Sequence, residues 1–383
     1  MMNMIKLVSD TIDKNDITNL VNWLSQDEIP RLTKGDMTIE FEKKWSEKIG
    51  VNKTTFVNSG SSAILLAIAA LKESGKLKNN KIVVPALSWL TDVSSPMQLG
   101  MDVILCDCNL DDLSIDINHF KQLVKEEDPS SLILVSVLGL VPNMSEIVDI
   151  CNENNIILIE DVCESMGSKF QDKYLGTFGS VSVFSLYYGH HLSTIEGGLI
   201  CTNDEELNDI IVSMRSHGWD RDWSKEKQKE YREKYNIDDF NSLYTFYYPG
   251  FNFRSTDLQA FIGLSQIDKL DRFSINRNKN FKLYNKNISI NDLEIKNTDE
   301  NFISNFAYPV VSKNREKIVN KLIQNNIEVR PLIAGSMARK PFWKGRVDNL
   351  PNCDVINNHG FYIPNHQDLT EKDILNICKI ING

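Results

Sequence analysis

Residues 58–62 (NSGSS) could bind a phosphorylated ligand, because they follow an apolar run and open a helical one. Gly60 would let the backbone approach a ligand closely, and the free N–H groups at a helix N-terminus bind phosphate. A serine that only caps the helix is the alternative explanation. The segment therefore predicts either a phosphate site at Gly60 and Ser61 or an ordinary helix start.

Trp89 and Asp161 could hold a flat aromatic ligand. Trp89 follows the apolar run 81–85, and an aromatic side chain there can form one wall for a planar ring. Asp161 follows the run 156–160 (IILIE). A carboxylate there can pair with a pyridinium nitrogen and keep it protonated, which makes the ring an electron sink. A tryptophan of the core or of an interface, and an aspartate that caps a helix, are the alternatives.

Two adjacent histidines, His190 and His191, precede Glu196-Gly197-Gly198. A histidine pair on a strand-to-loop turn is unlike core histidines, and imidazole moves protons near neutral pH. A metal site is the alternative. Adjacent side chains diverge, however, and no His, Cys or carboxylate set with familiar ligand spacing surrounds the pair. We therefore expect acid–base chemistry and no metal.

The elements that must position these residues are buried strands alternating with helices. Val/Ile/Leu-rich runs, typical of strands buried on both faces, occupy residues 55–58, 81–85, 101–106, 131–138, 156–160, 181–185 and 198–202. Helices are expected at 61–73 and 257–273, and a charged surface segment at 222–242. The pattern predicts an α/β fold with a mostly parallel sheet, whose ligands bind beyond the carboxyl ends of the strands.

The 383 residues are enough for two domains. We predict a large α/β domain over 1–275 and a small C-terminal α+β domain over 276–383. In the small domain, residues 306–311, 315–324 and 371–381 should form short strands and helices.

The amino-acid composition limits the kinds of partner and compartment that we expect for the chain. The chain has 42 Lys+Arg and 52 Asp+Glu, a net charge of −10, which argues against nucleic acid or anionic lipid as a general partner. The first sixteen residues lack the apolar region of a signal peptide, and no stretch reaches the length of a membrane span. The seven cysteines form no CxxC pair, which is typical of a reduced, cytoplasmic protein.

The order of these motifs resembles the DegT/DnrJ/EryC1/StrS family of sugar aminotransferases, which are fold-type I pyridoxal-phosphate enzymes. The resemblance runs nearly end to end. It is carried by the Ser-Gly-Ser turn, by residues 85–89 (PALSW), the Glu-Asp turn and Glu-Gly-Gly, and by residues 215–218 (RSHG), 250–254 (GFNFR) and 329–332 (VRPL). It implies an aspartate-aminotransferase-like fold and a homodimer with shared active sites.

One departure from the family decides the expected reaction. The aminotransferases carry a cofactor-binding lysine five residues after the serine of the Phe-Ser block, and in this chain that position, counted from Ser185, is His190. No lysine occurs from Tyr174 to Ser224. The substitution resembles the sugar 3-dehydratases of the family, as does Asn365-His366-Gln367.

The resemblance therefore implies C3 deoxygenation of a nucleotide-linked 4-keto-6-deoxyhexose, with glutamate as amino donor and release of ammonia. GDP-4-keto-6-deoxy-D-mannose, a substrate of colitose and O-antigen lipopolysaccharide biosynthesis, is the expected sugar. Pyridoxal or pyridoxamine 5'-phosphate would be held without a covalent bond. Relatives acting on CDP-sugars add a [2Fe–2S] cluster. The region where their Cys-x-Cys would stand, nearly sixty residues after Cys201, has no cysteine.

The resemblance also assigns roles. His190 would be the catalytic base. Gly60, Ser61 and Ser185 would bind the phosphate, Trp89 would stack on the ring, Asp161 would face its nitrogen, and Glu164 would touch its hydroxyl side.

Three further residues follow from the same comparison. Asn252 would reach the phosphate from the second subunit, and His217 and Arg254 would receive the carboxylate of glutamate. For Asn252 and Arg254, helix-start capping and surface charge are the alternative. Action on another nucleotide sugar, or a catalytically silent protein that only binds the cofactor or sugar, remains open for the chain as a whole.

Overall fold

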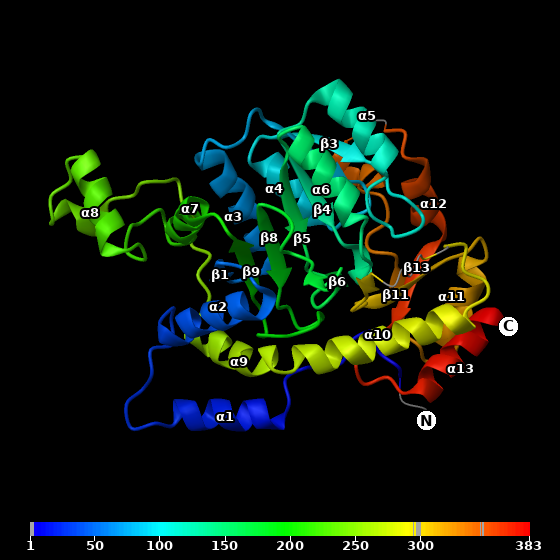
Figure 1. Cartoon of the computed structure of the whole chain (residues 1–383). Coiled ribbons are helices and arrows are strands. Elements are labelled where there is room, and N and C mark those ends of the chain that lie inside the picture. The colour runs from blue at the N-terminus through cyan, green and yellow to red at the C-terminus, as the bar shows by residue number, and fades with distance from the viewer. Residues whose placement is uncertain (1–3, 294, 296–299, 345, 347) are drawn as a thin grey trace.

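The computed structural model describes residues 4–293, 295, 300–344, 346 and 348–383, and its centre is a seven-stranded sheet (Figure 1). The strands are β1 (Lys53–Val57), β2 (Lys81–Pro85), β3 (Asp102–Cys106), β4 (Ser131–Val135), β5 (Ile157–Asp161), β8 (Val181–Ser185) and β9 (Gly198–Thr202). They lie in the order β1-β9-β8-β5-β4-β2-β3. Pairing is parallel from β3 to β8, and β9 runs antiparallel to β8 and β1. The predicted α/β fold with a mostly parallel sheet is confirmed.

One predicted strand was too long. The apolar run 131–138 continues after β4 ends, but residues Val137–Gly139 form a 3₁₀ turn, η1. Leu138 there has φ 51° and Gly139 φ 88°, and backbone in this left-handed region cannot continue a strand. The turn brings the Leu138 N–H within 2.9 Å of the Glu164 carboxylate.

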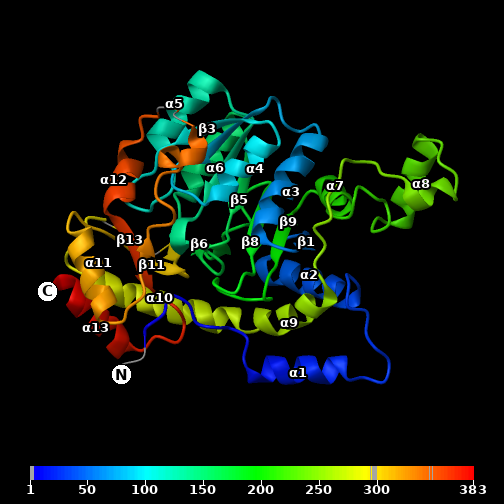
Figure 2. The ribbon, with the colours of Figure 1, turned by 180° about the vertical axis from the view of Figure 1, so that it is seen from behind.

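Helices connect the strands and cover the sheet (Figures 1 and 2). They are α1 (Lys14–Leu24), α2 (Asp36–Ile49), α3 (Gly60–Glu73), α4 (Leu90–Gln98), α5 (Ile117–Glu127), α6 (Met144–Glu153), α7 (Glu205–Arg215), α8 (Lys225–Lys234), α9 (Asp257–Ile267), α10 (Leu270–Asn287), α11 (Arg315–Gln324), α12 (Pro351–His359) and α13 (Glu371–Asn382).

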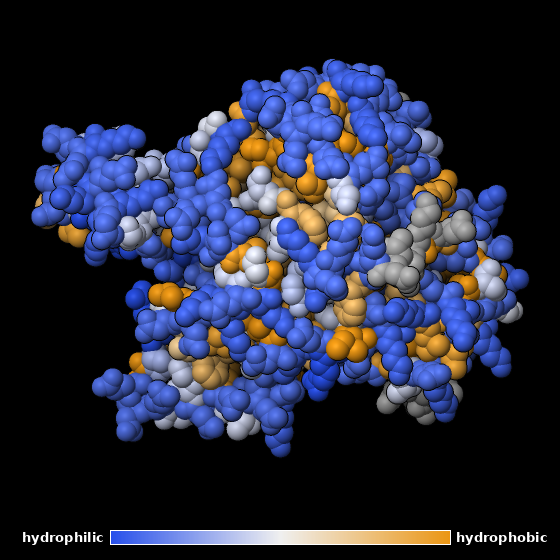
Figure 3. All heavy atoms as spheres, viewed as in Figure 1, coloured by the Kyte–Doolittle hydropathy of each residue, from blue (hydrophilic) through white to orange (hydrophobic). Residues whose placement is uncertain are grey.

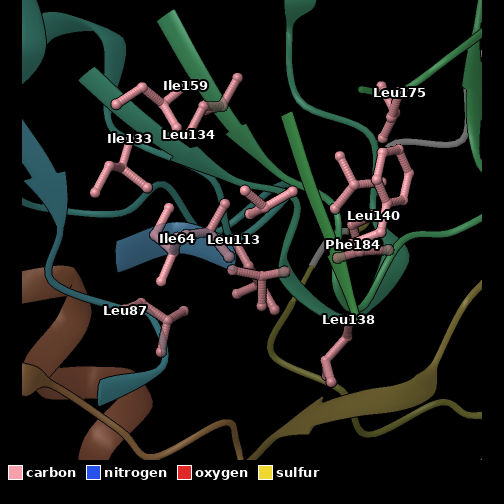
Figure 4. Close-up of a cluster of buried hydrophobic side chains, with 14 of the residues drawn as sticks. Ile64, Leu87, Leu113, Ile133, Leu134, Leu138, Leu140, Ile159, Leu175 and Phe184 are labelled. Atoms are coloured by element: carbon pink, nitrogen blue, oxygen red, sulfur yellow. The ribbon is translucent and has the colours of Figure 1, made fainter. Parts of the chain in front are cut away.

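Helix α3 leads to the site and is largely buried. Its Ala/Leu/Ile-rich sequence is apolar on most of its circumference, and it packs against β1, β8 and β9. Figure 4 shows Ile64 of α3 in the apolar core with Ile133 and Leu134 of β4 and Ile159 of β5. This packing fixes the N-terminus of α3 beside the strand ends.

The single helix predicted over 257–273 is wrong, because the structure has two helices, α9 and α10. The chain breaks at Asp268 and Lys269. The Lys269 Nζ forms ion pairs with Asp13 (2.9 Å) and Asp16, which lie at the start of α1. These ion pairs are tertiary contacts, so a helical pattern in the local sequence cannot reveal them. Helix α10 runs across position 275, and the division into domains at that position stays a prediction.

The C-terminal part contributes a second sheet, in the order β11 (Ala307–Val311), β13 (Gly360–Pro364) and β12 (Arg330–Pro331), and all of its pairs are antiparallel. A third, small sheet joins β10 (Asn301–Phe302) to β6 (Lys169–Phe170) and β7 (Lys173–Tyr174). The Met337 N–H donates to the Ala86 carbonyl over 2.8 Å. This contact holds the C-terminal part against the loop that follows β2.

The segment predicted at the surface, 222–242, projects from the body and carries α8 (Figure 1). The face of the molecule in Figure 3 is mostly hydrophilic, with smaller hydrophobic areas between. Within the described part of the chain, no helix combines the length and apolar character needed to cross a bilayer.

Candidate active site

A cavity of about 480 Å³ opens beyond the ends of β2, β5 and β8 and beside the N-terminus of α3. Seven of the ten predicted site residues line it, namely Gly60, Ser61, Trp89, Asp161, Glu164, Ser185 and His190. The other three, Asn252, His217 and Arg254, lie outside it. Parallel strands explain the gathering, because their carboxyl ends meet at one edge of the sheet.

The turn before α3 is a helix cap that borders the cavity. The Ser59 Oγ accepts the Ser62 N–H over 3.0 Å, so Ser59 is the N-cap. Gly60 and Ser61 are the first two residues of the helix, where N–H groups have no intrahelical acceptor. A Cβ on Gly60 would lie 2.8 Å from the Ser185 Cβ. Only glycine therefore lets the helix N-terminus and the Ser185 hydroxyl approach the same space.

Trp89, at the start of α4, and Asp161, the last residue of β5, line the same cavity. Trp89 is the N-cap residue of α4 and is 55% exposed, so it is not a core tryptophan. The Asp161 Oδ1 accepts the Cys163 N–H over 2.8 Å, a local bond of the capping type. Asp161 nevertheless lines the cavity. Its carboxylate can therefore accept the Cys163 N–H and also interact with a ligand in the cavity.

Three carboxyl groups, those of Asp92, Asp161 and Glu164, lie together at the base of the cavity. Burial raises the pKa of Glu164 to about 8, the Leu138 N–H opposes this rise, and the Asp161 charge adds to it. Burial, followed by the charge of Asp161, raises the pKa of Asp92 well above its usual range. Burial in the cavity therefore favours the protonated forms of both Asp92 and Glu164.

We expect Glu164→Gln to stabilise the protein increasingly as the pH rises. Folding raises the pKa of Glu164 from 4.5 to about 8, so between these values the folded protein keeps a proton that the unfolded chain has lost. The free energy of unfolding must then fall as the pH rises, and glutamine removes this contribution. Thermal unfolding of the cofactor-free protein from about pH 5 to about pH 8 measures the effect.

The matched control is Glu230→Gln on exposed α8, far from the cavity. A difference between Glu164→Gln and the original protein that stays constant with pH would contradict the buried, protonated state of Glu164.

His190 is held as a neutral base. Its Nδ1 lies 2.5 Å from the Cys163 carbonyl oxygen, which can only accept, so the hydrogen sits on Nδ1 and Nε2 is left as the acceptor. The ring packs against Phe306, with centroids 5.3 Å apart, and Tyr187, at 6.0 Å. Burial lowers the pKa of His190, although the Cys163 carbonyl and the Asp161 charge oppose this. The arrangement suits proton abstraction near neutral pH.

His191, in contrast, points away from the cavity. It is fully buried, and its Nε2 lies 2.8 Å from the Ser304 carbonyl oxygen. Burial lowers the pKa of His191 well below its usual range. The neighbouring histidines thus diverge as expected, and His191 joins the loop after β8 to the segment before β11.

Asn252, His217 and Arg254 form a separate cluster. The Arg254 Nε donates to the Asn252 Oδ1 over 3.1 Å, and the His217 N–H donates to the Phe251 carbonyl over 2.6 Å. The N-cap of α9 is Thr256, so Asn252 and Arg254 are not helix caps. The Asn58 N–H bonds the Phe253 carbonyl, which places the cluster just outside the phosphate turn. Within one chain these residues do not reach the cavity.

Two cysteines and an aspartate form a cluster that was not predicted from the sequence. Cys353 lies beside Asp107 and Cys108, and their possible ligand atoms are within 4.8 Å of one another. The Asp107 Oδ1 accepts the N–H groups of Cys108 (2.9 Å) and Cys353 (2.8 Å), and its Oδ2 accepts that of Asn352 (3.0 Å). Through these bonds the Asp107 carboxylate caps the start of α12.

All seven cysteines, which lie in the described ranges, are unpaired.

Several residues that line the cavity were not predicted from the sequence, among them Asp92, Phe306, Glu328, Arg330 and Tyr362. Arg330 belongs to the Val-Arg-Pro-Leu block, which carried the resemblance but no assigned role. Asp92 stands three residues after Trp89, which is the spacing of a capping box at a helix N-terminus. This spacing was the sequence signal that could have indicated Asp92. Phe306 and Tyr362 gave no local signal.

The model of the DegT/DnrJ/EryC1/StrS aminotransferase family matches residues 11–382, and the chain belongs to this family. The GDP-4-keto-6-deoxy-D-mannose 3-dehydratase of Escherichia coli O55:H7 is 34% identical over 349 residues, covering 88% of this chain and 89% of the relative.

A solved structure described as GDP-4-keto-6-deoxymannose-3-dehydratase with a trapped PLP-glutamate geminal diamine is 31% identical. It has a TM-score of 0.89, and the match covers 98% of this chain and all of that one. The GDP-perosamine synthase of Escherichia coli O157:H7 is 26% identical, over 91% of this chain and 90% of the relative. The chain therefore belongs to an enzyme family whose members are named for different reactions.

Proposed function

We propose that this protein is a pyridoxal-phosphate-dependent 3-dehydratase of a nucleotide-linked 4-keto-6-deoxyhexose, with glutamate as amino donor and ammonia as a product. The observation that carries the proposal is His190, which faces the cavity with a free Nε2. Among the described residues that line the cavity there is no lysine. Without a lysine there, the described lining offers no side-chain amine to hold the cofactor covalently.

The cavity fits pyridoxal phosphate. The open N–H groups of Gly60 and Ser61, with the Ser185 hydroxyl, suit the phosphate, and the Cβ that Gly60 lacks would close the approach. Trp89 offers an exposed aromatic face, and Asp161 offers a carboxylate for a protonated ring nitrogen. When bound, the cofactor supplies an electron sink.

His190 has the task of moving protons. Its neutral Nε2 can take a proton and, as imidazolium, return it to the C3 oxygen of the sugar as that oxygen leaves. The Cys163 carbonyl fixes the ring so that Nε2 rather than Nδ1 faces the cavity. Glu164, with its raised pKa, can donate a hydrogen bond to the cofactor or the sugar.

The proposed sugar is GDP-4-keto-6-deoxy-D-mannose, the compound for which the two dehydratase relatives are named. We propose that the enzyme acts in the colitose branch of O-antigen biosynthesis. The unpaired cysteines suit a reducing compartment, and we place the reaction in the cytoplasm.

We further propose a homodimer in which Asn252, His217 and Arg254 complete the partner's cavity. The three residues cluster outside the cavity of their own chain, although the family resemblance assigns them to the ligands. A second copy would reconcile these observations. The expected test is complementation between two inactive variants.

Co-expressed His190→Asn and Arg254→Ala chains should regain about a quarter of the original activity, because half of the dimers are mixed and each has one intact site. Each variant alone serves as the control. If mixed dimers form but stay inactive, Arg254 does not act across the interface.

The direct assay incubates the protein with glutamate, pyridoxal phosphate and several 4-keto-6-deoxy nucleotide sugars, and measures ammonia and product mass. We expect ammonia, 2-oxoglutarate and a product that has lost the C3 oxygen. A product that gains an amino group would favour an aminotransferase like the GDP-perosamine synthase relative. Failure of glutamate to change the absorbance of the bound cofactor would favour a silent binding protein.

A further inference from the structure

Asp92 connects two of the residues proposed to contact the cofactor ring. It is the third residue of α4, and none of its surface is exposed. Its Oδ2 accepts the Trp89 N–H over 3.1 Å. Its carboxyl group neighbours that of Asp161 in the lining of the same cavity. A single side chain therefore reaches from the helix start that carries Trp89 to the end of β5.

The other oxygen of Asp92, Oδ1, is buried and has no donor. Two neighbouring carboxylates offer only acceptors, so one of them must carry a proton for a hydrogen bond to form between them. The Asp161 Oδ1 already accepts the Cys163 N–H, whereas the Asp92 Oδ1 has nothing to accept. The unpaired Oδ1 is thus explained if it holds the hydrogen.

The charged and titratable groups around Asp92 favour the same assignment. Those that act on it are Asp161 and Glu164, both acids, and the Cys163 thiol lies beside Asp161. Burial and the Asp161 charge raise the pKa of Asp92 well above its usual range. A second negative charge beside Asp161 would be costly in this setting.

We propose that Asp92 is a positioning residue which stays protonated, donating its hydrogen to Asp161 while accepting the Trp89 N–H. Asp161 is then held at a fixed place as the single carboxylate of the pair, and Trp89 is tied to the same anchor. The role in orienting the ring rests on the proposed function, because it takes pyridoxal phosphate as the ligand.

The test compares Asp92→Asn with Asp92→Leu. Asparagine keeps one donor for Asp161 and one acceptor for Trp89 and carries no charge, so it reproduces the protonated acid. Leucine fills a similar volume and removes both bonds. We expect Asp92→Asn to bind pyridoxal phosphate within about threefold of the original protein, and Asp92→Leu to bind it about 10- to 100-fold more weakly.

Pyridoxal phosphate itself is the probe, titrated by its absorbance and by quenching of tryptophan fluorescence. Binding by Asp92→Leu at the original affinity overturns the proposal. Binding by Asp92→Asn that is weakened by more than about tenfold also overturns it, because Asp92 would then act as an anion.

An infrared spectrum of the cofactor-free protein gives a second readout. The band of protonated carboxyl groups at neutral pH should lose intensity in Asp92→Asn, and Glu164→Gln accounts for the part due to Glu164. An unchanged band in Asp92→Asn overturns the proposal, even where Asp92→Leu does not fold. If the original protein does not bind pyridoxal phosphate, the proposed function fails, while this spectrum still decides the protonation of Asp92.

Discussion

His190→Asn should lower the rate of sugar dehydration by about 100- to 10,000-fold, because it removes the only group in the described cavity placed as a neutral base. Asparagine keeps a hydrogen-bond donor for the Cys163 carbonyl, so the loop should retain its shape. Cofactor affinity should therefore change far less than the rate. Single-turnover assays with the loaded enzyme and the nucleotide sugar separate the two.

The adjacent His191 is the matched control. It bonds the Ser304 carbonyl in the protein interior, so His191→Asn should lower thermal stability while retaining most of the activity per folded molecule. Full activity in His190→Asn together with loss in His191→Asn would reverse the assignment of the base.

His190→Lys probes the geometry of the same position. A lysine there would place a primary amine in the cavity, and we expect it to become linked to the cofactor. Borohydride reduction followed by mass spectrometry should then show one added cofactor per chain. An unmodified chain would contradict the placement of residue 190 beside the cofactor aldehyde.

The second large effect is expected for Asp161→Asn. The carboxylate at the end of β5 is the group proposed to keep the ring nitrogen protonated, and an amide has no charge with which to do so. We expect the reaction with glutamate to slow by about 100- to 1,000-fold. Stopped-flow absorbance of the bound cofactor after mixing with glutamate measures this step.

Asp116→Asn is a suitable comparison, because Asp116 caps α5 outside the cavity and accepts the His119 N–H over 2.9 Å. It should leave the glutamate reaction unchanged. An Asp161→Asn protein that reacts as fast as Asp116→Asn would remove Asp161 from the proposed role.

Local sequence was sufficient for much of the fold. The run 81–85 coincides with β2, and 181–185 and 198–202 coincide with β8 and β9. Strands buried on both faces need unbroken apolar runs, so the signal was strong. Where the chain turns for tertiary reasons, at Leu138 and at Lys269, the same apolar or helical pattern continued and the predicted elements were too long.

For the site, the sequence by itself determined which groups with definite chemistry are present: the Ser-Gly turn at Gly60, the acid at Asp161, and a histidine at position 190, where the family resemblance expects a lysine. Residue type and order carry this information, because each group stands in a segment that follows a predicted strand. Only the tertiary structure decided which nitrogen of His190 is free, that His191 faces the interior, and that Asp92 neighbours Asp161 in the cavity. These facts depend on contacts between segments far apart in the chain, such as the Cys163 carbonyl with His190, and spacing along one segment does not encode them.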